Sequence, residues 1–165
     1  MVGLADIELE DSGVSVIKRM KQFWFSLLVL GFVPASFATP ESQTFDDYTI
    51  HLNAFNSDTL QPSMAKAYNI IRSKNRGLLT ISVVKKSLSA SNGLPVKAQV
   101  QAKATNLTGQ LKDIQIREIH DGEAVYYISV FPVADKEVLD FTIHVTPQDD
   151  GGPYVVEMRQ QFFTQ

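Results

Sequence analysis

The sequence contains no cysteine among its 165 residues. This absence excludes disulfide bonds, thiol nucleophiles, thiolate metal ligands and covalent haem attachment through a cysteine pair. It also excludes a lipid anchor on an N-terminal cysteine. The folded chain must therefore be stabilised by packing alone.

Residue types that are typical of catalytic and metal sites are few and scattered. The three histidines are His51, His120 and His144, and no two of them have a spacing that would bring ligands together from one element. There is no Gly-x-Ser-x-Gly motif, and the Asp pairs at 46–47 and 149–150 lie in predicted turns, where carboxylates bond backbone amides. We therefore predict no catalytic residue, no metal site and no cofactor.

The chain also lacks a strong charge of one sign. It has 15 Lys and Arg against 18 Asp and Glu, for a net charge of −3. A mixed, nearly neutral composition argues against nucleic acid or an anionic membrane as the main partner.

Long hydrophobic runs are missing as well. The apolar run Phe23–Val33 has about eleven residues, too few to cross a bilayer core but typical of the hydrophobic part of a signal peptide. Cations at 18–21 precede it, and Pro34 and the small residues of Ser36-Phe37-Ala38 follow. We predict a secretory signal peptide cleaved after Ala38, with an uncleaved transmembrane anchor as the alternative.

Acidic residues between Asp6 and Asp11 precede this segment, which is unusual for a signal peptide. We therefore interpret residues 1–38 as an extension plus signal peptide, with Met20 as the hypothetical true start. Residues 39–165 then form a single domain of 127 residues, long enough to bury a core, with no membrane span in the mature chain.

Period-two alternation dominates this domain and predicts an all-β fold. Asn92-Gly93, Asp121-Gly122 and Asp149–Pro153 are turn signals, and Pro62 begins one short predicted helix. The pattern indicates an antiparallel immunoglobulin-like β-sandwich of about seven strands, with a small closed barrel as the alternative. The predicted strands are 48–55, 78–86, 96–105, 110–120, 124–133, 137–146 and 154–163.

A cluster of cations follows the predicted helix, at Arg72-Ser73-Lys74-Asn75-Arg76. It could receive a carboxylate, a phosphate or an acidic partner surface, or it could be a solvated loop whose arginines bond carbonyls and carboxylates at the sheet edge. The second interpretation is the commoner one for charge runs. The candidate partner or ligand patch consists of Asn53, Phe55, Asn56, Tyr68, Arg72, Lys74 and Arg76.

Several runs of the sequence resemble one protein family. They include Tyr48-Thr49-Ile50-His51, Ile71–Arg76, Val125-Tyr126-Tyr127 and Gln160-Gln161-Phe162-Phe163. The family is a group of exported Gram-negative envelope proteins described as a domain of unknown function (DUF4426). The resemblance covers the predicted mature chain and implies a periplasmic protein with an immunoglobulin-like sandwich, but it implies no activity.

These observations favour a soluble, non-catalytic interaction module that docks on an envelope protein through the candidate patch. A small-ligand or anion-binding domain that uses the same patch is the alternative. A hydrolytic enzyme is the least favoured, since it would need His51 or His144 close to a carboxylate, which the sequence does not predict.

Overall fold

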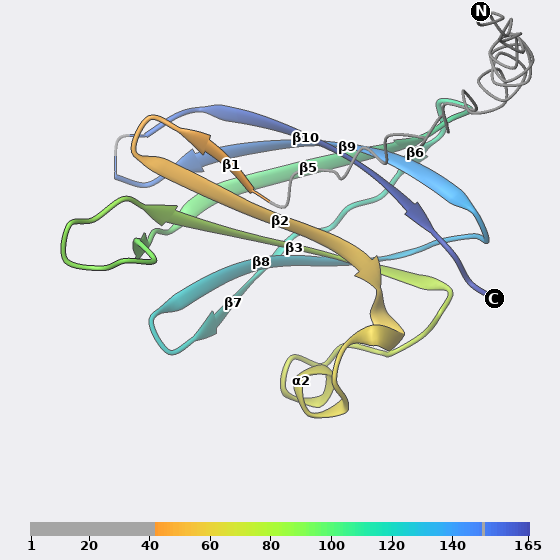
Figure 1. The fold of residues 1–165 in the computed structure, drawn as a ribbon. Coiled ribbons are helices and arrows are strands. Elements are labelled where there is room, and N and C mark those ends of the chain that lie inside the picture. Colours follow the sequence, from red (N-terminus) through yellow and green to blue (C-terminus); the bar gives the residue numbers. More distant parts are fainter. Residues whose placement is uncertain (1–41, 150) are drawn as a thin grey trace, which may run out of the picture. The chain divides into compact units, whose positions relative to one another are not determined.

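The computed structural model describes residues 42–149 and 151–165, which form ten strands, a 3₁₀ turn and one short helix (Figure 1). The predicted signal peptide, its Ala38 cleavage site and the Met20 start lie outside the described residues. No helix in the described part of the chain is both long and apolar enough to span a membrane. The elements are β1 (Ser42–Phe45), β2 (Tyr48–Asn56), η1 (Ser57–Thr59), α2 (Pro62–Ala67), β3 (Arg76–Lys85), β4 (Leu94–Pro95), β5 (Ala98–Asn106), β6 (Leu111–Lys112), β7 (Arg117–Asp121), β8 (Ala124–Pro132), β9 (Glu137–Pro147) and β10 (Tyr154–Phe162).

The strands form two antiparallel sheets that pack face to face (Figure 1). The first sheet has the order β1-β2-β3-β8-β7, with β4 beside the end of β3, and the second has the order β10-β9-β5-β6. Among the described residues the two sheets share no strand pairing, so the fold is a sandwich and not the closed barrel. The prediction of an all-β antiparallel sandwich with one short helix is confirmed.

The alternating residues of both sheets meet in one core. In β2, for example, Ile50, Leu52 and Ala54 are buried, whereas His51 and Asn53 are exposed. Each aliphatic or aromatic side chain buried in this way stabilises the fold by about 1.5–3 kcal/mol. At the centre of the core the ring of Phe131 lies 5.7 Å from that of Phe141 and 5.8 Å from that of Phe162.

The prediction of one strand over 110–120 is wrong. Leu111–Lys112 forms β6 in the second sheet, Arg117–Asp121 forms β7 in the first, and residues 113–116 cross between the sheets. Ile114 is buried and Ile116 packs against the core from this crossing segment. A segment that crosses the edge of the core keeps the same alternation as a strand, so the pattern alone does not reveal the change of sheet.

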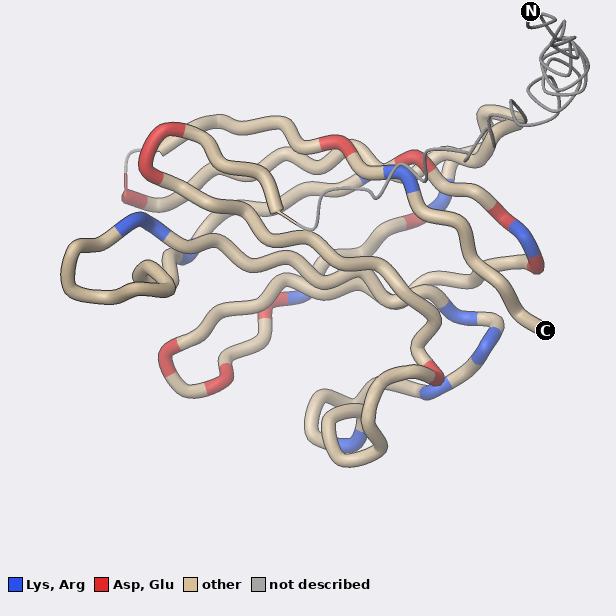
Figure 2. The backbone as a smooth tube through the Cα atoms, in the orientation of Figure 1, with Lys and Arg blue, Asp and Glu red and all other residues tan. Residues whose placement is uncertain are grey.

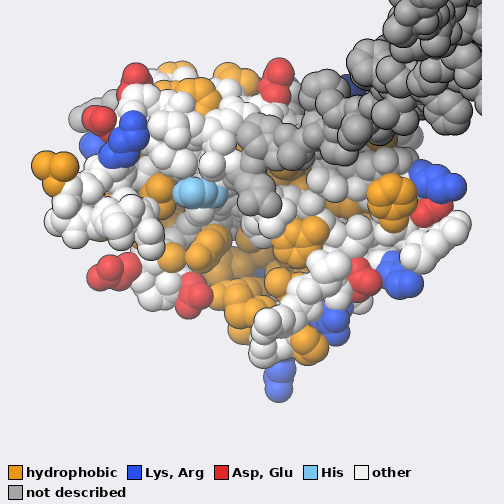
Figure 3. Space-filling model, in the orientation of Figure 1, with side chains coloured by type: hydrophobic (Ala, Val, Ile, Leu, Met, Phe, Trp, Pro, Cys, Tyr) orange, Lys and Arg blue, Asp and Glu red, His pale blue; other side chains and the backbone are white. Residues whose placement is uncertain are grey.

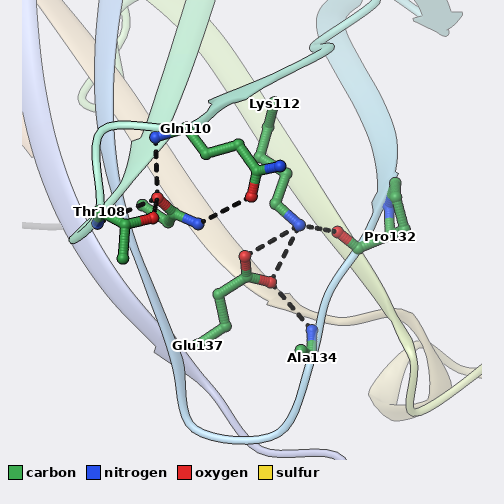
Figure 4. Close-up of polar contacts among 7 residues, drawn as sticks. Thr108, Gln110, Lys112, Pro132, Ala134 and Glu137 are labelled. Atoms are coloured by element: carbon green, nitrogen blue, oxygen red, sulfur yellow. Dashed lines mark hydrogen bonds and ion pairs between the residues drawn. The ribbon is translucent and has the colours of Figure 1, made fainter.

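A partly buried ion pair holds one end of the sandwich together (Figure 4). Nζ of Lys112 in β6 lies 2.9 Å from Oε1 of Glu137 at the start of β9, and it also donates to the carbonyl of Pro132 at 3.2 Å. Oε2 of Glu137 accepts a hydrogen bond from the amide of Ala134 at 2.9 Å. These contacts fix the β8–β9 connection against the β5–β6 hairpin.

A second polar cluster fixes the opposite end, at the β9–β10 connection. The hydroxyl of Tyr48 donates to Oδ1 of Asp149 at 2.8 Å, and Nζ of Lys85 lies 2.9 Å from Oδ2 of the same carboxylate. The hydrogen bond from Lys85 holds the pKa of the Asp149 carboxyl below its ordinary value. The carboxylate therefore joins the ends of β2 and β3 to the end of β9.

The long connection between β2 and β3 carries the predicted helix. Pro62 occupies the first turn of α2, as its fixed φ angle favours, and the helix ends at Ala67. Residues 57–75 fold back beneath the outer face of the first sheet, and this arrangement creates the most distinctive surface of the molecule (Figure 1).

Candidate functional site

A second hydrophobic cluster lies on the outer face of the first sheet, beneath the 57–75 connection. Ala65 and Ile70 from this connection are buried against Leu78 of β3 and Ile128 of β8. Phe55, the one large apolar residue on the outer face of β2, pairs with Leu78 and packs into this cluster. Phe55 therefore interrupts the polar pattern of β2 because the connection covers that part of the strand.

The cluster does not fill the space between the connection and the sheet. A pocket of about 240 Å³ remains, and Figure 3 shows apolar side chains gathered in this hollow. Met64 and Tyr126, which also line it, are 40% and 38% exposed, so the apolar lining continues onto the surface. Residues that line the pocket include Phe55, Met64, Tyr68, Ile119 and Tyr126.

Two polar groups meet at the mouth of the pocket. The hydroxyl of Tyr68, at the end of α2, donates to Oδ2 of Asp121, at the end of β7, over 2.9 Å. This hydrogen bond, together with burial, raises the pKa of Tyr68 above its ordinary value. Asp121 is the charged residue among those that line the pocket.

The structure separates the predicted patch into groups with different surroundings. Phe55 and Tyr68 lie together in the pocket. Asn53 is exposed on the neighbouring outer face, in a shallow depression shared with His51 and Tyr126. Phe55, Tyr68 and Asn53 of the predicted patch therefore lie on the same outer face of the first sheet.

Two other members of the patch hold the chain in place. Nδ2 of Asn56 donates to the carbonyls of Lys74 and Phe163, at 2.6 and 3.0 Å. The guanidinium of Arg72 donates to the carbonyl of Asp58 at 2.5 Å. These contacts match the structural interpretation of the cation run, whereas Lys74 and Arg76 are exposed on the same loop.

The histidines do not converge. His51 lies on the outer face of the first sheet and His144 on the outer face of the second. Nε2 of His120 lies 2.6 Å from Oε1 of Glu118 on β7, and both side chains are partly exposed. Within 42–149 and 151–165, no group of three or more His, Asp or Glu side chains is placed to hold a metal ion.

Sequence reasoning missed Met64, Ile119, Asp121 and Tyr126 as members of the site. The sequence predicts only a role in a turn for Asp121. In the structure it is the last residue of β7, directly before the tight turn to β8, and it also lines the pocket. The register of that hairpin places Ile119 opposite Tyr126 on the outer face. Only a prediction that β7 starts at Arg117 and pairs with β8 would have placed Ile119 and Asp121 beside Tyr126 on this face.

The family model for the domain of unknown function DUF4426 matches residues 42–165, so the chain belongs to this family. A crystal structure of a DUF4426 family protein (PA0388) from Pseudomonas aeruginosa PAO1 is 31% identical and covers 77% of this chain and 96% of that chain, with a TM-score of 0.65. The family resemblance in the sequence is confirmed. Among curated proteins, none matches the chain.

The fold is also similar to that of a more distant protein. FetP from uropathogenic Escherichia coli strain F11, recombinantly expressed in the periplasm of E. coli BL21(DE3), is 10% identical, with a TM-score of 0.53 over 77% of this chain and 95% of that chain. A copper-bound variant of FetP with a single substitution matches with the same identity and TM-score, over 76% of this chain and 95% of that chain. At this identity the likeness concerns the fold alone.

Proposed function

Because the chain belongs to the DUF4426 family, whose description carries no activity, we propose its function from the geometry of the first sheet. The domain is a non-catalytic interaction module of the Gram-negative envelope, and its pocket accepts an apolar side chain of a partner protein. The observation that carries this proposal is the incompletely filled hydrophobic cluster beneath the 57–75 connection, with Met64 and Tyr126 exposed in its lining.

The composition of the pocket favours binding over chemistry. Its lining is mostly apolar, and its polar members are one aspartate, two tyrosines and one threonine. An apolar pocket that takes one large side chain of a partner is typical of the energetic centre of a protein interface. The exposed cations Lys74 and Arg76 would then contribute to the rim, where charges affect association rate more than affinity.

The volume of the pocket favours a side chain over a free small molecule. Sites for small ligands occupy about 300–1,000 Å³ and surround most of the ligand. The pocket, at about 240 Å³, is below this range and opens at one side (Figure 3). A small-ligand or anion-binding domain remains the second candidate, supported by the exposed cations of the 72–76 loop.

The proposed location is the periplasm, after export and cleavage near Ala38. Its support is the predicted signal peptide and the export that the family resemblance implies. Periplasmic expression of FetP, which shares the fold, is consistent with this location.

In-cell crosslinking followed by mass spectrometry tests the proposal. The substitution Met64→Glu places a charge in the lining of the pocket, and we expect it to reduce the yield of a specific crosslinked partner by about tenfold or more. Leu111→Glu is the matched control, because Leu111 is 70% exposed on β6 in the second sheet. Equal yields from the Met64 variant and the unmodified protein would contradict the pocket as the interface.

The crosslinking experiment also tests the cations. Reversal of Arg76 to Glu should change capture less than the Met64 substitution does, because rim charges contribute little to affinity. If Arg76→Glu abolishes the crosslinked product and Met64→Glu leaves its yield unchanged, the anion-binding alternative is favoured.

A further inference from the structure

We propose that the pocket selects a partner segment in which the apolar anchor lies within two residues of a lysine or arginine. This inference rests on the proposed function and specifies the chemistry of the partner. It is carried by the position of Asp121 and by the charge of the hairpin on which it lies.

The carboxylate of Asp121 lies at the mouth of an otherwise apolar pocket. Its Oδ2 accepts the Tyr68 hydroxyl at 2.9 Å, and a carboxylate has further lone pairs that can accept a cation. Among the described residues Asp121 takes part in no ion pair, although five such pairs are present elsewhere. An exposed, unpaired anion next to an apolar pocket favours a cation adjacent to the apolar group that enters.

The hairpin as a whole reinforces this preference. On residues 117–124, Glu118 is paired with Lys97 and His120, whereas Asp121 and Glu123 take part in no ion pair among the described residues. Figure 2 shows acidic positions at the tip of this hairpin and basic positions along the 66–76 connection on the other side. The side of the pocket formed by β7 and β8 is therefore its negative side.

The nearby cation on β7, Arg117, forms no ion pair with Asp121 in the described part of the chain. Its guanidinium donates instead to the carbonyl of Tyr68. Glu123 at the hairpin tip is exposed and, in the described part of the chain, has no ion-pair partner. A lysine or arginine of the partner would find two carboxylates within reach of its flexible side chain.

The spacing follows from the geometry of an extended segment. Successive side chains alternate in direction and residues i and i+2 lie on one side, so a cation two residues from the anchor points toward the same surface. The long aliphatic stem of lysine or arginine can cover Tyr126 while its charged group reaches Asp121. A glutamate two residues from the anchor would instead be repelled by the carboxylates of Asp121 and Glu123.

The test uses three acetylated, amidated pentapeptides as probes. Each has a central phenylalanine with a serine on either side, and its two end residues, two positions from the anchor, are lysines, serines or glutamates. They are titrated into ¹⁵N-labelled protein purified from cells that express the full chain, and amide shifts at Ile119, Asp121 and Tyr126 report binding. We expect the lysine peptide to bind about two- to fivefold more tightly than the serine peptide, which is the range of an exposed charge pair, and the glutamate peptide to bind most weakly.

Two variants assign the preference to Asp121. Asp121→Asn keeps an oxygen that can accept the Tyr68 hydroxyl, and it should abolish the difference between the lysine and serine peptides. Glu157→Gln, an exposed carboxylate on β10 in the second sheet, is the matched control and should leave the difference unchanged. Added salt should reduce the preference in the unmodified protein, since the pair is exposed.

The outcomes separate this inference from the proposed function. Equal binding of the lysine and serine peptides at the pocket, or a preference that survives Asp121→Asn, overturns the selection for a cation but supports the pocket as a binding site. If no peptide shifts these amides and Met64→Glu leaves crosslinking unchanged, both proposals are overturned. A lysine preference that is lost in Asp121→Asn alone supports both.

Discussion

The hydroxyl of Tyr68 and the carboxylate of Asp121 join two segments that are 53 residues apart in the chain, over a distance of 2.9 Å. Tyr68 directly follows α2 and Asp121 ends β7, so the bond fastens the 57–75 connection to the β7–β8 hairpin across the mouth of the pocket. The pocket therefore keeps its shape partly through a single exposed hydrogen bond.

Tyr68→Phe should loosen the connection without unfolding the sandwich. We expect hydrogen exchange of the Ile70 amide, which bonds the carbonyl of Ala65 at 2.8 Å, to become about two- to tenfold faster, because local opening costs less free energy. Amides of the core strands should exchange at unchanged rates. Tyr126→Phe is the control, because in the described residues the Tyr126 hydroxyl has no hydrogen-bond partner; equal acceleration in both variants would contradict the role of the bond.

Two buried serines should respond in opposite ways to the same substitution. Oγ of Ser57, which is fully buried, lies 3.0 and 3.1 Å from the carbonyls of Ile71 and Ser73 and accepts the Ser73 amide at 3.0 Å. Ser57→Ala leaves these backbone groups unpaired and should lower the free energy of unfolding by about 1–3 kcal/mol.

Ser129 is 1% exposed in the core, and its hydroxyl has no partner within the described residues. Ser129→Ala removes an unpaired polar group and should leave stability unchanged or raise it slightly. Urea denaturation of both variants checks the pair. A loss for Ser129→Ala as large as that for Ser57→Ala would show that the hydroxyl of Ser129 does have a partner.

The sequence was sufficient to predict the sandwich but not the set of residues that line the pocket. Alternation over 48–55 predicted a strand with one buried face, and in β2 this face carries Ile50 and Leu52 into the core. Phe55 and Tyr68, which the sequence analysis placed in one candidate patch, both line the pocket.

The rest of the site depends on contacts between distant segments. Ile119 and Asp121 reach the pocket only because residues 113–116 leave the second sheet and β7 pairs with β8 in the first. Asn56 and Arg72 looked available for a ligand, but their partners are backbone carbonyls whose positions no side-chain pattern encodes. Local periodicity describes which face of a strand is apolar, not which segment covers it.

Breaking the Lys112–Glu137 pair should cost more than breaking an exposed pair on the same sheet (Figure 4). The two side chains are 18% and 11% exposed, so Lys112→Met leaves Glu137 with little solvent to replace its partner. We expect the free energy of unfolding to fall by about 1–3 kcal/mol, measured by urea denaturation. The control is Arg159→Met, which breaks an ion pair with Asp140 whose side chains are 64% and 40% exposed, and it should cost clearly less. Equal losses would show that burial does not strengthen the first pair.

The carboxylate of Asp149 should make stability depend on pH in the acid range. Its pKa is lowered in the folded protein, chiefly by the hydrogen bond from Lys85, so the folded state binds this proton less readily than the unfolded state. The resulting stability is fully present above the unfolded pKa of about 3.9 and is lost as the pH falls through the lower folded value. Asp149→Asn, which keeps an acceptor for Tyr48, should therefore be less stable than the unmodified protein near neutral pH.

The difference between the two proteins should shrink as the pH falls below about 4, because the unmodified carboxylate then becomes protonated as well. Urea denaturation over a series of pH values measures this convergence. Asp47→Asn is the control, since Asp47 is exposed and forms no ion pair among the described residues, and it should leave the free energy of unfolding near neutral pH unchanged. A stability difference for Asp149→Asn that stays constant into acid would mean that the contact with Lys85 stabilises the β9–β10 connection through geometry rather than charge.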